Sequence, residues 1–353
     1  MPDPAESEIA SPPYAPLLQM AYGALSTQIL CIAAQLGLAE ELAQAGPITA
    51  MELATKLQIE PALLERILRA LVSMNVCSEL GGSRFQLASL GEYLRPNHPE
   101  SLEARVLLNG LVFYRMWGEL IETVRTGVSG SQRTVGMPLY EYFVQAPQVG
   151  ALFDRTMASA AQYRHRPAVA AYDFGQFKTV VDIGGGNGAL MAEILQLHPQ
   201  LTGIVFDLPR AARAAQQTID AHGLSDRCRF VGGDAFEGVP AGGDAYVFSN
   251  FLVSWGDDEA VIPLRNCRKT IGENGKILLI EWVMPAGGEF RDDFRFWDTA
   301  IAMDVNMLSL FGGGSGRVRT SSAFRDLLAA AGFGLISVVP TRGSVSVIEA
   351  GPL

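Results

Sequence analysis

Short apolar runs alternate with stretches of helical periodicity throughout the part of the chain that follows Lys178. Five of the runs are predicted strands, at residues 179–183, 203–206, 228–231, 245–248 and 276–281, and helices are predicted to begin at Ala189, Arg210 and Asp257. Strands that alternate with helices form a parallel sheet with helices on both faces. Two further runs, 335–340 and 344–350, predict an antiparallel hairpin. The chain is therefore predicted to be α/β, with a doubly wound, mostly parallel sheet of seven strands.

The first 100 residues predict short helices followed by a hairpin. Thr49 can cap a helix that runs to Leu57, and Glu52 completes a capping box there. A second helix is predicted at 61–74, and a hairpin follows at 76–87. The apolar face of the second helix consists of Leu63, Leu64, Ile67, Leu68 and Leu71. Two helices and then a hairpin are typical of a winged helix.

Charge argues against DNA binding by this segment. Residues 1–100 contain five basic and eleven acidic residues, and the whole chain has a formal net charge of −10. A surface that reads DNA is normally basic, so no nucleic-acid partner is expected. The sequence predicts three parts: a winged-helix-like dimerisation domain at 1–100, a helical linker that forms one wall of the substrate pocket at 101–175, and a cofactor-binding catalytic domain at 176–353.

A stretch without any charge, residues 9–39, precedes the winged helix. No Lys or Arg occurs before Lys56, whereas a signal peptide begins with basic residues. Polar side chains interrupt the stretch and no basic anchor flanks it, so it predicts a helix buried between the subunits of a homodimer rather than a membrane span. The four cysteines are far apart in the sequence, which favours free thiols in a reducing cytoplasm and no metal site.

The residues 181–188, VDIGGGNG, end the first strand of the sheet and open a helix. Their glycines allow a tight turn and a close approach of a ligand to the main chain, and Asp182 beside them suits a cationic amino-acid group. Asp207 ends the second strand, where a carboxylate can accept hydrogen bonds from both hydroxyls of a ribose. The third strand ends in Asp234 and Phe236, which suit the amino group and the ring of an adenine. A dinucleotide site also uses a glycine turn, but its usual spacing is GxGxxG and not the GxGxG seen here.

Together these motifs resemble one enzyme family. The residues that carry the resemblance are 182–188, Phe206-Asp207-Leu208-Pro209, Gly233-Asp234-Ala235-Phe236, Trp255-Gly256-Asp257-Asp258 and Arg319-Thr320. They occur in the same order in the S-adenosylmethionine (SAM)-dependent small-molecule O-methyltransferases, which include the plant caffeic-acid and hydroxyindole enzymes and bacterial polyketide-tailoring enzymes. The resemblance covers about the whole chain and implies a SAM-methyltransferase sheet and a homodimer with interlocked N-terminal helices. It also implies that SAM is surrounded by Asp182, Gly184, Gly186, Asp207, Leu208, Asp234, Ala235, Phe236 and Ser249.

The chain departs from the family pattern where the catalytic base is expected. Many members have His-Asp before the Trp that matches Trp255, whereas this chain has Val253 and Ser254. Val318 stands where a second carboxylate is expected, although Glu281 is present. The usual base is therefore absent, and a base normally contributes about 10²–10⁴-fold to the rate.

Four routes remain without that base: an acidic substrate, positioning alone, another base, or a reaction other than methylation. The anthracycline-tailoring branch also resembles this stretch, with an apolar residue in place of the His and a Ser that matches Ser249. That branch includes a methyltransferase thought to work by positioning and a relative that binds SAM while it catalyses hydroxylation. We expect methyl transfer to a hydroxyl of a small aromatic or polyketide-like compound of secondary metabolism. The alternative is a non-methylating decarboxylation, hydroxylation or pericyclic reaction by a SAM-binding enzyme of the same fold.

Candidate catalytic and substrate residues follow from the same patterns. Ser254 and Asp304 are the candidate catalytic residues, because Asp304 is a carboxylate on an otherwise apolar helix face, predicted at 294–310. His165 lies between two arginines and is expected to be exposed, with a pKa lowered by its positive neighbours. The resemblance places substrate contacts on the predicted helix 294–310. The candidate substrate residues are Phe153, Met157, Trp297, Met303, Asn306 and Met307.

Overall fold

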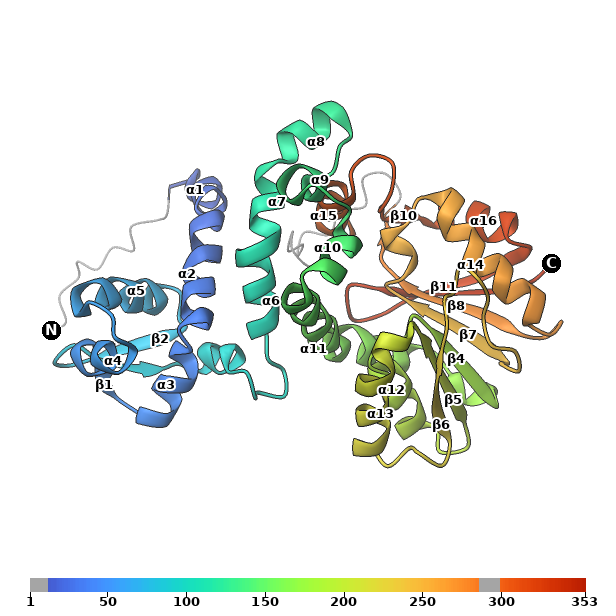
Figure 1. Cartoon of the computed structure of the whole chain (residues 1–353), viewed down its shortest axis with the longest axis horizontal. Coiled ribbons are helices and arrows are strands. Elements are labelled where there is room, and N and C mark those ends of the chain that lie inside the picture. Colours follow the sequence, from blue (N-terminus) through green and yellow to red (C-terminus); the bar gives the residue numbers. More distant parts are fainter. Residues whose placement is uncertain (1–11, 286–298) are drawn as a thin grey trace, which may run out of the picture. The chain divides into compact units, whose positions relative to one another are not determined.

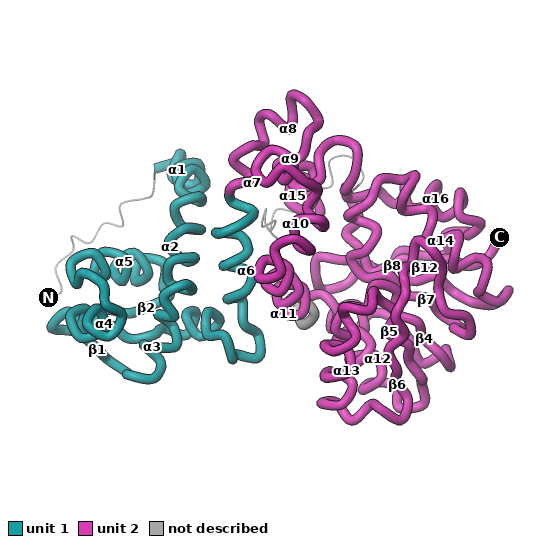
Figure 2. The backbone as a smooth tube through the Cα atoms, in the orientation of Figure 1, with its two compact units in different colours: residues 1–114 teal, residues 115–353 magenta. Residues whose placement is uncertain are grey.

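The computed structural model describes residues 12–285 and 299–353, and it divides the chain into two compact units, residues 1–114 and 115–353 (Figure 2). Each unit is described by itself. The boundary at Tyr114 falls inside the predicted segment 101–175, and residues 115–175 belong to the same unit as the seven-stranded sheet. Trp297, a candidate substrate residue, lies outside the described residues.

The first unit contains the winged helix that the sequence predicts. Its elements are α1 (Ala15–Ala21), α2 (Gly23–Gln35), α3 (Leu38–Ala45), β1 (Ile48–Thr49), α4 (Ala50–Leu57), α5 (Pro61–Ser73), β2 (Cys77–Leu80), β3 (Arg84–Leu87), a 3-10 helix (Ser89–Leu94), α6 (Glu103–Leu108) and a π-helical turn (Asn109–Phe113). The strands form an antiparallel sheet in the order β1-β3-β2. The predicted capping box is present, because the Thr49 side chain accepts from Glu52 N–H and the Glu52 carboxylate accepts from Thr49 N–H.

The apolar face of α5 is narrower than the sequence suggests. Leu64, Leu68 and Leu71 are at most 1% exposed, whereas Leu63 is 55% exposed. Residues four and seven positions apart share one helix face, and Leu63 is turned about 100° away from Leu64. The prediction that Leu63 faces the core was therefore wrong.

The uncharged N-terminal stretch is not one helix. It forms α1 and α2, which meet at Tyr22 with a bend of 49°. Within residues 12–285 and 299–353 no single helix is long and apolar enough to cross a bilayer, and α1 and α2 reach that length only as a bent pair. Both helices leave large apolar side chains exposed, namely Tyr14, Leu17, Leu18, Met20, Tyr22 and Leu25.

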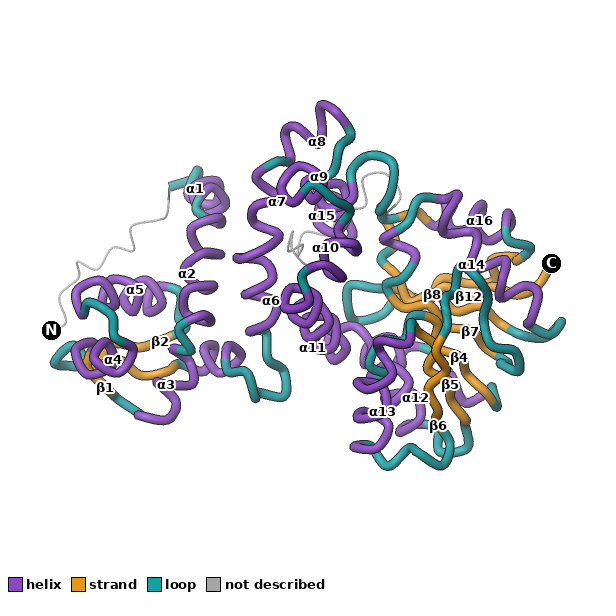
Figure 3. Tube along the Cα trace, in the orientation of Figure 1, coloured by secondary structure: helices purple, strands orange, loops and turns teal. Residues whose placement is uncertain are grey.

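The second unit is built on the predicted seven-stranded sheet, with the order β11-β12-β8-β7-β4-β5-β6 (Figures 1 and 3). The strands are β4 (Thr179–Ile183), β5 (Thr202–Asp207), β6 (Cys228–Gly232), β7 (Ala245–Ser249), β8 (Lys276–Glu281), β11 (Phe333–Pro340) and β12 (Ser346–Pro352). The first five are parallel, and the C-terminal hairpin joins β8 in the antiparallel direction. The α/β fold class is therefore confirmed.

The helices of the second unit pack against the sheet or against one another. Its helices are α7 (Tyr114–Gly118), α8 (Leu120–Thr126), α9 (Gly130–Val135), α10 (Leu139–Gln145), α11 (Pro147–Ala171), α12 (Ala189–Leu197), α13 (Ala212–Ala221), α14 (Asp257–Thr270), α15 (Ala300–Phe311) and α16 (Ser321–Ala330). A short parallel pair, β9 (Val283–Met284) and β10 (Arg319–Thr320), lies beside the main sheet. One apolar core joins α14 and α16 to alternate residues of the strands, such as Phe248 and Leu279, which are fully buried. Because β4, β5, β6, β7 and β8 are parallel, their carboxyl ends lie at one edge of the sheet, and the predicted motifs follow these ends.

Candidate cofactor and active site

The order in which successive strands are added to the sheet changes direction at β4. From β4 the sheet continues to β5 and β6 on one side and to β7 and β8 on the other. In open α/β sheets, ligands bind outside the carboxyl ends of the strands at such a switch point. Ile183 at the end of β4 is paired with Phe206 of β5 and Phe248 of β7. The residues that follow these three therefore meet at one edge.

The glycine turn after β4 is held against β5. Gly184 N–H donates to the Phe206 carbonyl at 2.8 Å, and Gly186 N–H donates to the Asp207 carboxylate at 2.8 Å. Gly184 has φ +70°, and a Cβ at that position would lie 2.5 Å from the Phe251 ring. Only glycine fits such a left-handed and crowded position. The turn therefore presents bare main chain at the switch point.

The Asp207 carboxylate is engaged through both oxygens. Oδ2 accepts from Gly186 N–H and Oδ1 accepts from Leu208 N–H at 2.6 Å. Each carboxylate oxygen can accept two hydrogen bonds, so the half-buried group keeps capacity for ligand hydroxyls. Leu208 is 39% exposed beside it.

At the end of β6, a carboxylate and an aromatic ring lie together. Phe236 N–H donates to Asp234 Oδ1 at 2.9 Å, which orients the carboxylate. The Phe236 ring packs against Trp255 with centroids 4.7 Å apart. Asn266 Nδ2 donates to the carbonyls of Ala235 and Phe236, which fixes this segment. Asn266 is a residue that sequence reasoning missed, because its partners are main-chain atoms 30 and 31 residues away.

Asp182 is a buried carboxylate beneath the turn. It is 1% exposed, and its Oδ2 has no hydrogen-bond partner among the described residues. Burial, with a smaller contribution from the Asp207 charge, raises the pKa of Asp182 to about 7. A buried, underpaired carboxylate beside a glycine cradle is well suited to a ligand that carries positive charge. The residues at this edge therefore fit SAM, which combines an adenosine with a cationic amino-acid end.

Because the pKa of Asp182 is raised, the free energy of unfolding is expected to depend on pH. An unfolded Asp loses its proton near pH 3.9, so between that pH and about 7 the folded protein binds more protons than the unfolded chain. The stabilising contribution of this group is complete below the unfolded pKa and is lost as pH rises to about 7. We expect Asp182→Asn to remove this loss, so that the free energy of unfolding of the variant relative to wild type increases from pH 4 to 7.

Urea unfolding at a series of pH values measures this difference, with a limiting slope of about 1.4 kcal/mol per pH unit. Asp326→Asn, at an exposed position on α16, is the control. A difference between Asp182→Asn and wild type that does not change with pH would contradict the prediction.

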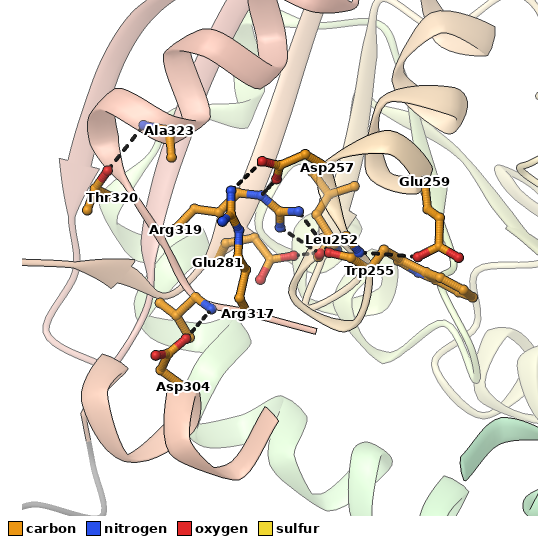
Figure 4. Close-up of polar contacts among 12 residues, drawn as sticks. Leu252, Trp255, Asp257, Glu259, Glu281, Asp304, Arg317, Arg319, Thr320 and Ala323 are labelled. Atoms are coloured by element: carbon orange, nitrogen blue, oxygen red, sulfur yellow. Dashed lines mark hydrogen bonds and ion pairs between the residues drawn. The ribbon is translucent and has the colours of Figure 1, made fainter. Parts of the chain in front are cut away.

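The turn after β7 carries Val253 and Ser254. The side chains of Glu281 and Arg319 form hydrogen bonds with the main chain of this turn (Figure 4). Leu252 N–H donates to Glu281 Oε1 at 2.8 Å. Arg319 donates to the carbonyls of Leu252 and Trp255, both at 2.8 Å. The turn is therefore fixed by the ends of β8 and β10.

The two charged groups that hold this turn lie deep in the protein. Glu281 is 1% exposed, and burial raises its pKa to about 7. Arg319 is 2% exposed, and burial lowers its pKa. Its Nε donates to Asp257 Oδ1 at 2.9 Å, and Asp257 also pairs with Arg317 (Figure 4). The sequence identified Arg319 as part of a motif but gave it no role.

The two candidate catalytic residues already have partners. The Tyr140 hydroxyl donates to Ser254 Oγ at 2.8 Å. Asp304 Oδ1 accepts from Val318 N–H at 2.8 Å, so this carboxylate secures the segment before β10 (Figure 4). Ser254 and Val253 are each 7% exposed.

An aromatic group surrounds the Tyr140–Ser254 pair. The Tyr140 ring is stacked on Trp255, with centroids 5.8 Å apart and an angle of 20°. The ring centroids of Phe153 and Phe311 lie 6.3 and 5.6 Å from the ring centroid of Tyr140. Phe153, a candidate substrate residue, thus belongs to an aromatic surface at the turn. Tyr140 and Phe311 were not among the candidate substrate residues, because these rings come from distant parts of the sequence.

The remaining candidate substrate residues that the structure describes lie on α11 and α15. Met157 follows Phe153 by one turn of α11 and is half-buried. Asn306 accepts from Trp117 Nε1 at 2.9 Å, and its Nδ2 lies 4.0 Å from Met303 Sδ. Met307 is 7% exposed. The sequence predicts a helix at 294–310, whereas α15 begins at Ala300, after the extended N-cap Thr299, and ends at Phe311.

His165 is not the exposed residue that the sequence predicts. Its Nε2 lies 3.2 Å from Ser249 Oγ, and its Nδ1 is sealed from solvent with no partner among the described residues. Burial, with a smaller effect of Arg164, lowers the pKa of His165 to about 3. Asn250, in the left-handed conformation with φ +52°, donates from Nδ2 to Ser249 Oγ at 3.4 Å. Ser249 therefore lies in a polar group of three residues.

Comparison with protein families gives two matches along the chain. A family model described as an O-methyltransferase domain matches residues 117–334. A second model, described as an O-methyltransferase dimerisation domain, matches residues 18–96. The two matches fall on the sheet-containing unit and on the winged helix.

Several known proteins are similar in sequence or structure to almost the whole of this chain. Phenazine O-methyltransferase PhzM of Lysobacter antibioticus is 38% identical over 337 residues, which cover 96% of this chain and 96% of that protein. The crystal structure of LaPhzM has a TM-score of 0.90 and 36% identity, and it covers 97% of this chain and 100% of that one. NcsB1, an O-methyltransferase from neocarzinostatin biosynthesis, has a TM-score of 0.77 and 32% identity over 93% of this chain and 96% of its own. That structure contains SAM and 2-hydroxy-5-methyl naphthoic acid.

Proposed function

We propose that this chain, which belongs to the family of SAM-dependent O-methyltransferases, methylates a hydroxyl of a small aromatic or polyketide-like compound by holding that hydroxyl in place, without a histidine base. SAM supplies an activated methyl group, and the acceptor oxygen takes it as S-adenosylhomocysteine forms. The matched dimerisation domain supports a homodimer. The absence of nucleic-acid and membrane partners, and a cytoplasmic location, stay predictions from the sequence.

The cofactor is assigned to the edge of the sheet around the glycine turn. Gly184 and Gly186 would lie against it, and Asp182 would face its cationic end. Asp207 with Leu208 would hold the ribose. The adenine would be held by Asp234, Ala235 and Phe236. Ser249 would complete the site beside Gly184.

The acceptor class follows from the aromatic surface and from the relatives. PhzM is named for a phenazine and NcsB1 was crystallised with a naphthoic acid, so both handle fused aromatic rings. Tyr140, Trp255 and Phe153 present flat ring surfaces beside the turn that carries Ser254. A flat aromatic acceptor can pack against such surfaces. Met157, Met303, Asn306, Met307 and Trp297 stay candidates for the remainder of the pocket.

The proposal of positioning is supported by Val253, which the family resemblance matches to the position of the base, and by the hydrogen bonds with Glu281 and Arg319 that hold its turn. Ser254 and Tyr140 do not replace the base. Burial raises the pKa of Tyr140, so its hydroxyl stays protonated. A protonated tyrosine hydroxyl cannot act as the base that removes the proton of the substrate hydroxyl. The enzyme would therefore favour acceptors acidic enough to ionise without help.

The proposal is tested by turnover with methyl-labelled SAM and a panel of hydroxylated phenazines, naphthoates and quinones. Stoichiometric label in the product and S-adenosylhomocysteine are expected. Product formation without either would favour the alternative, a SAM-binding enzyme that does not methylate. Turnover should rise across the panel as the acceptor pKa falls, because only the ionised oxygen attacks.

Restoring the family base gives a second test. We expect Val253→His to keep activity and to raise kcat/KM for weakly acidic phenols by up to about 10²-fold, the lower end of what a base contributes. Val253→Leu is the matched control, because it changes the size of the side chain and adds no base. The pH dependence of kcat/KM distinguishes the two, since only the histidine adds a new ionisation. Loss of all turnover in a folded, SAM-binding Val253→His variant would contradict positioning at this turn.

A further inference from the structure

The order of the strands predicts where each end of the cofactor lies. Asp234 follows β6 and Asp207 ends β5, so an adenosine extends from β6 toward β4. The amino-acid end then reaches the carboxyl ends of β4 and β7. Ser249 ends β7 there, half-buried, next to the turn that begins at Gly184. Adjacent strands are about 4.8 Å apart, so Ser249 is within reach of any ligand on that turn.

The contacts of Ser249 Oγ with its neighbours determine whether the hydroxyl donates or accepts a hydrogen bond with a ligand. The neutral ring of His165 has one N–H, and its Nδ1 is sealed from solvent and has no partner within the described part of the chain. Unpartnered N–H groups are rarer in protein interiors than unpartnered acceptors, which assigns the proton to Nε2. Nε2–H then donates to Ser249 Oγ at 3.2 Å, and Asn250 Nδ2 donates to the same oxygen at 3.4 Å.

A serine hydroxyl has two lone pairs and one hydrogen. Both lone pairs of Ser249 are taken by His165 and Asn250, so its hydrogen is left to donate to an acceptor on a bound ligand. Of the two charged groups at the amino-acid end of SAM, only the carboxylate can accept it. The ammonium group cannot, and the buried Asp182 carboxylate offers it an acceptor at the same edge.

We infer that His165 is a cofactor-positioning residue, which forces the Ser249 hydroxyl to donate to the carboxylate of bound SAM. This inference rests on the proposed function, because it assumes SAM at the glycine turn. It gives His165, which comes from α11 and lies 84 residues from Ser249 in the sequence, a role in holding the cofactor.

Titration calorimetry with two ligands, SAM and its decarboxylated analogue, tests the inference. We expect Ser249→Ala to weaken SAM binding by about tenfold or more, since hydrogen bonds to charged groups contribute about 1.5–3 kcal/mol. Binding of the decarboxylated analogue should be unchanged, which also shows that the variant is folded. S-adenosylhomocysteine keeps the carboxylate and should be weakened as much as SAM.

His165 is tested with a matched pair of variants. Gln places an amide nitrogen near the position of the imidazole Nε2, so His165→Gln should bind SAM nearly as wild type does. His165→Leu removes the donor, frees a lone pair of Ser249 and should weaken SAM about threefold to tenfold, again without effect on the analogue. His222→Leu, on an exposed histidine after α13, is the surface control.

Two results would overturn the inference. The first is an equal loss of both ligands in Ser249→Ala, and the second is equal behaviour of His165→Gln and His165→Leu. Failure of the wild-type protein to bind SAM at all would instead refute the proposed function. The two failures are therefore distinguishable in one set of titrations.

Discussion

Asp207→Asn is expected to weaken SAM binding by about a hundredfold or more. Both Asp207 oxygens accept main-chain N–H groups, from Gly186 and Leu208, at 2.8 and 2.6 Å. An asparagine has one acceptor oxygen, so its NH₂ group would face one of these N–H groups. Each hydrogen bond to a charged group contributes about 1.5–3 kcal/mol. The loss of one bond to the turn and of the charge that faces the ribose gives the expected factor.

The matched control is Asp234→Asn, at the end of the neighbouring strand. Only Asp234 Oδ1 accepts a main-chain N–H, from Phe236, and an asparagine oxygen can keep that bond. We expect a loss of about tenfold or less, from the adenine contact alone. Titration calorimetry with SAM measures both variants. Equal losses would mean that the double engagement of Asp207 has no energetic importance, and wild-type affinity of Asp207→Asn would exclude it from the ribose site.

Arg319→Met is expected to have the largest effect on stability. The side chain is 1% exposed and donates to the carbonyls of Leu252 and Trp255 as well as to Asp257. Methionine fills the space but leaves two carbonyls without their donor and the buried Glu281 without a positive neighbour. Removing one partner of a buried charged network costs about 3–5 kcal/mol. Thermal unfolding should therefore occur about 10 °C lower.

Arg317→Met is the matched control, because Arg317 pairs with the same Asp257 carboxylate from the surface. Its side chain is 50% exposed, and exposed ion pairs contribute about 0–1 kcal/mol. A third variant, Arg319→Lys, keeps the charge but has one nitrogen in place of the planar guanidinium that reaches three acceptors. We expect it to be intermediate in stability. If Arg319→Met unfolds at the same temperature as Arg317→Met, the hydrogen bonds to the turn do not stabilise it.

Much of the cofactor edge could be predicted from the sequence. The glycine turn, Asp207 and Asp234 each follow an apolar run, and the carboxyl ends of parallel strands lie at one edge. Strand ends are local features, so errors in the predicted bounds were small: β5 begins at Thr202 rather than Gly203, and β12 begins at Ser346 rather than Ser344. The prediction that Val253 replaces the base also comes from the sequence, because Val253 lies within a recognisable motif.

The active-site side could be predicted only as a set of candidates. Ser254 and Asp304 were identified, but their partners were not: Tyr140 lies 114 residues from Ser254, and Asp304 bonds to the main chain of Val318. Main-chain partners leave no trace in side-chain patterns. His165 was predicted to be exposed because two arginines flank it, whereas its ring is packed against Ser249.

The sequence alone predicts an α/β O-methyltransferase with a dimerisation domain, and it places the expected SAM ligands at strand ends and Val253 at the expected position of the base. Those properties depend on local periodicity and on short motifs, which involve residues within one turn or one strand end. The tertiary structure alone decided that Arg319 holds the turn after β7, that Tyr140 donates to Ser254 and that His165 reaches Ser249. These contacts join segments 64 or more residues apart, and only the tertiary packing brings such segments within hydrogen-bond distance.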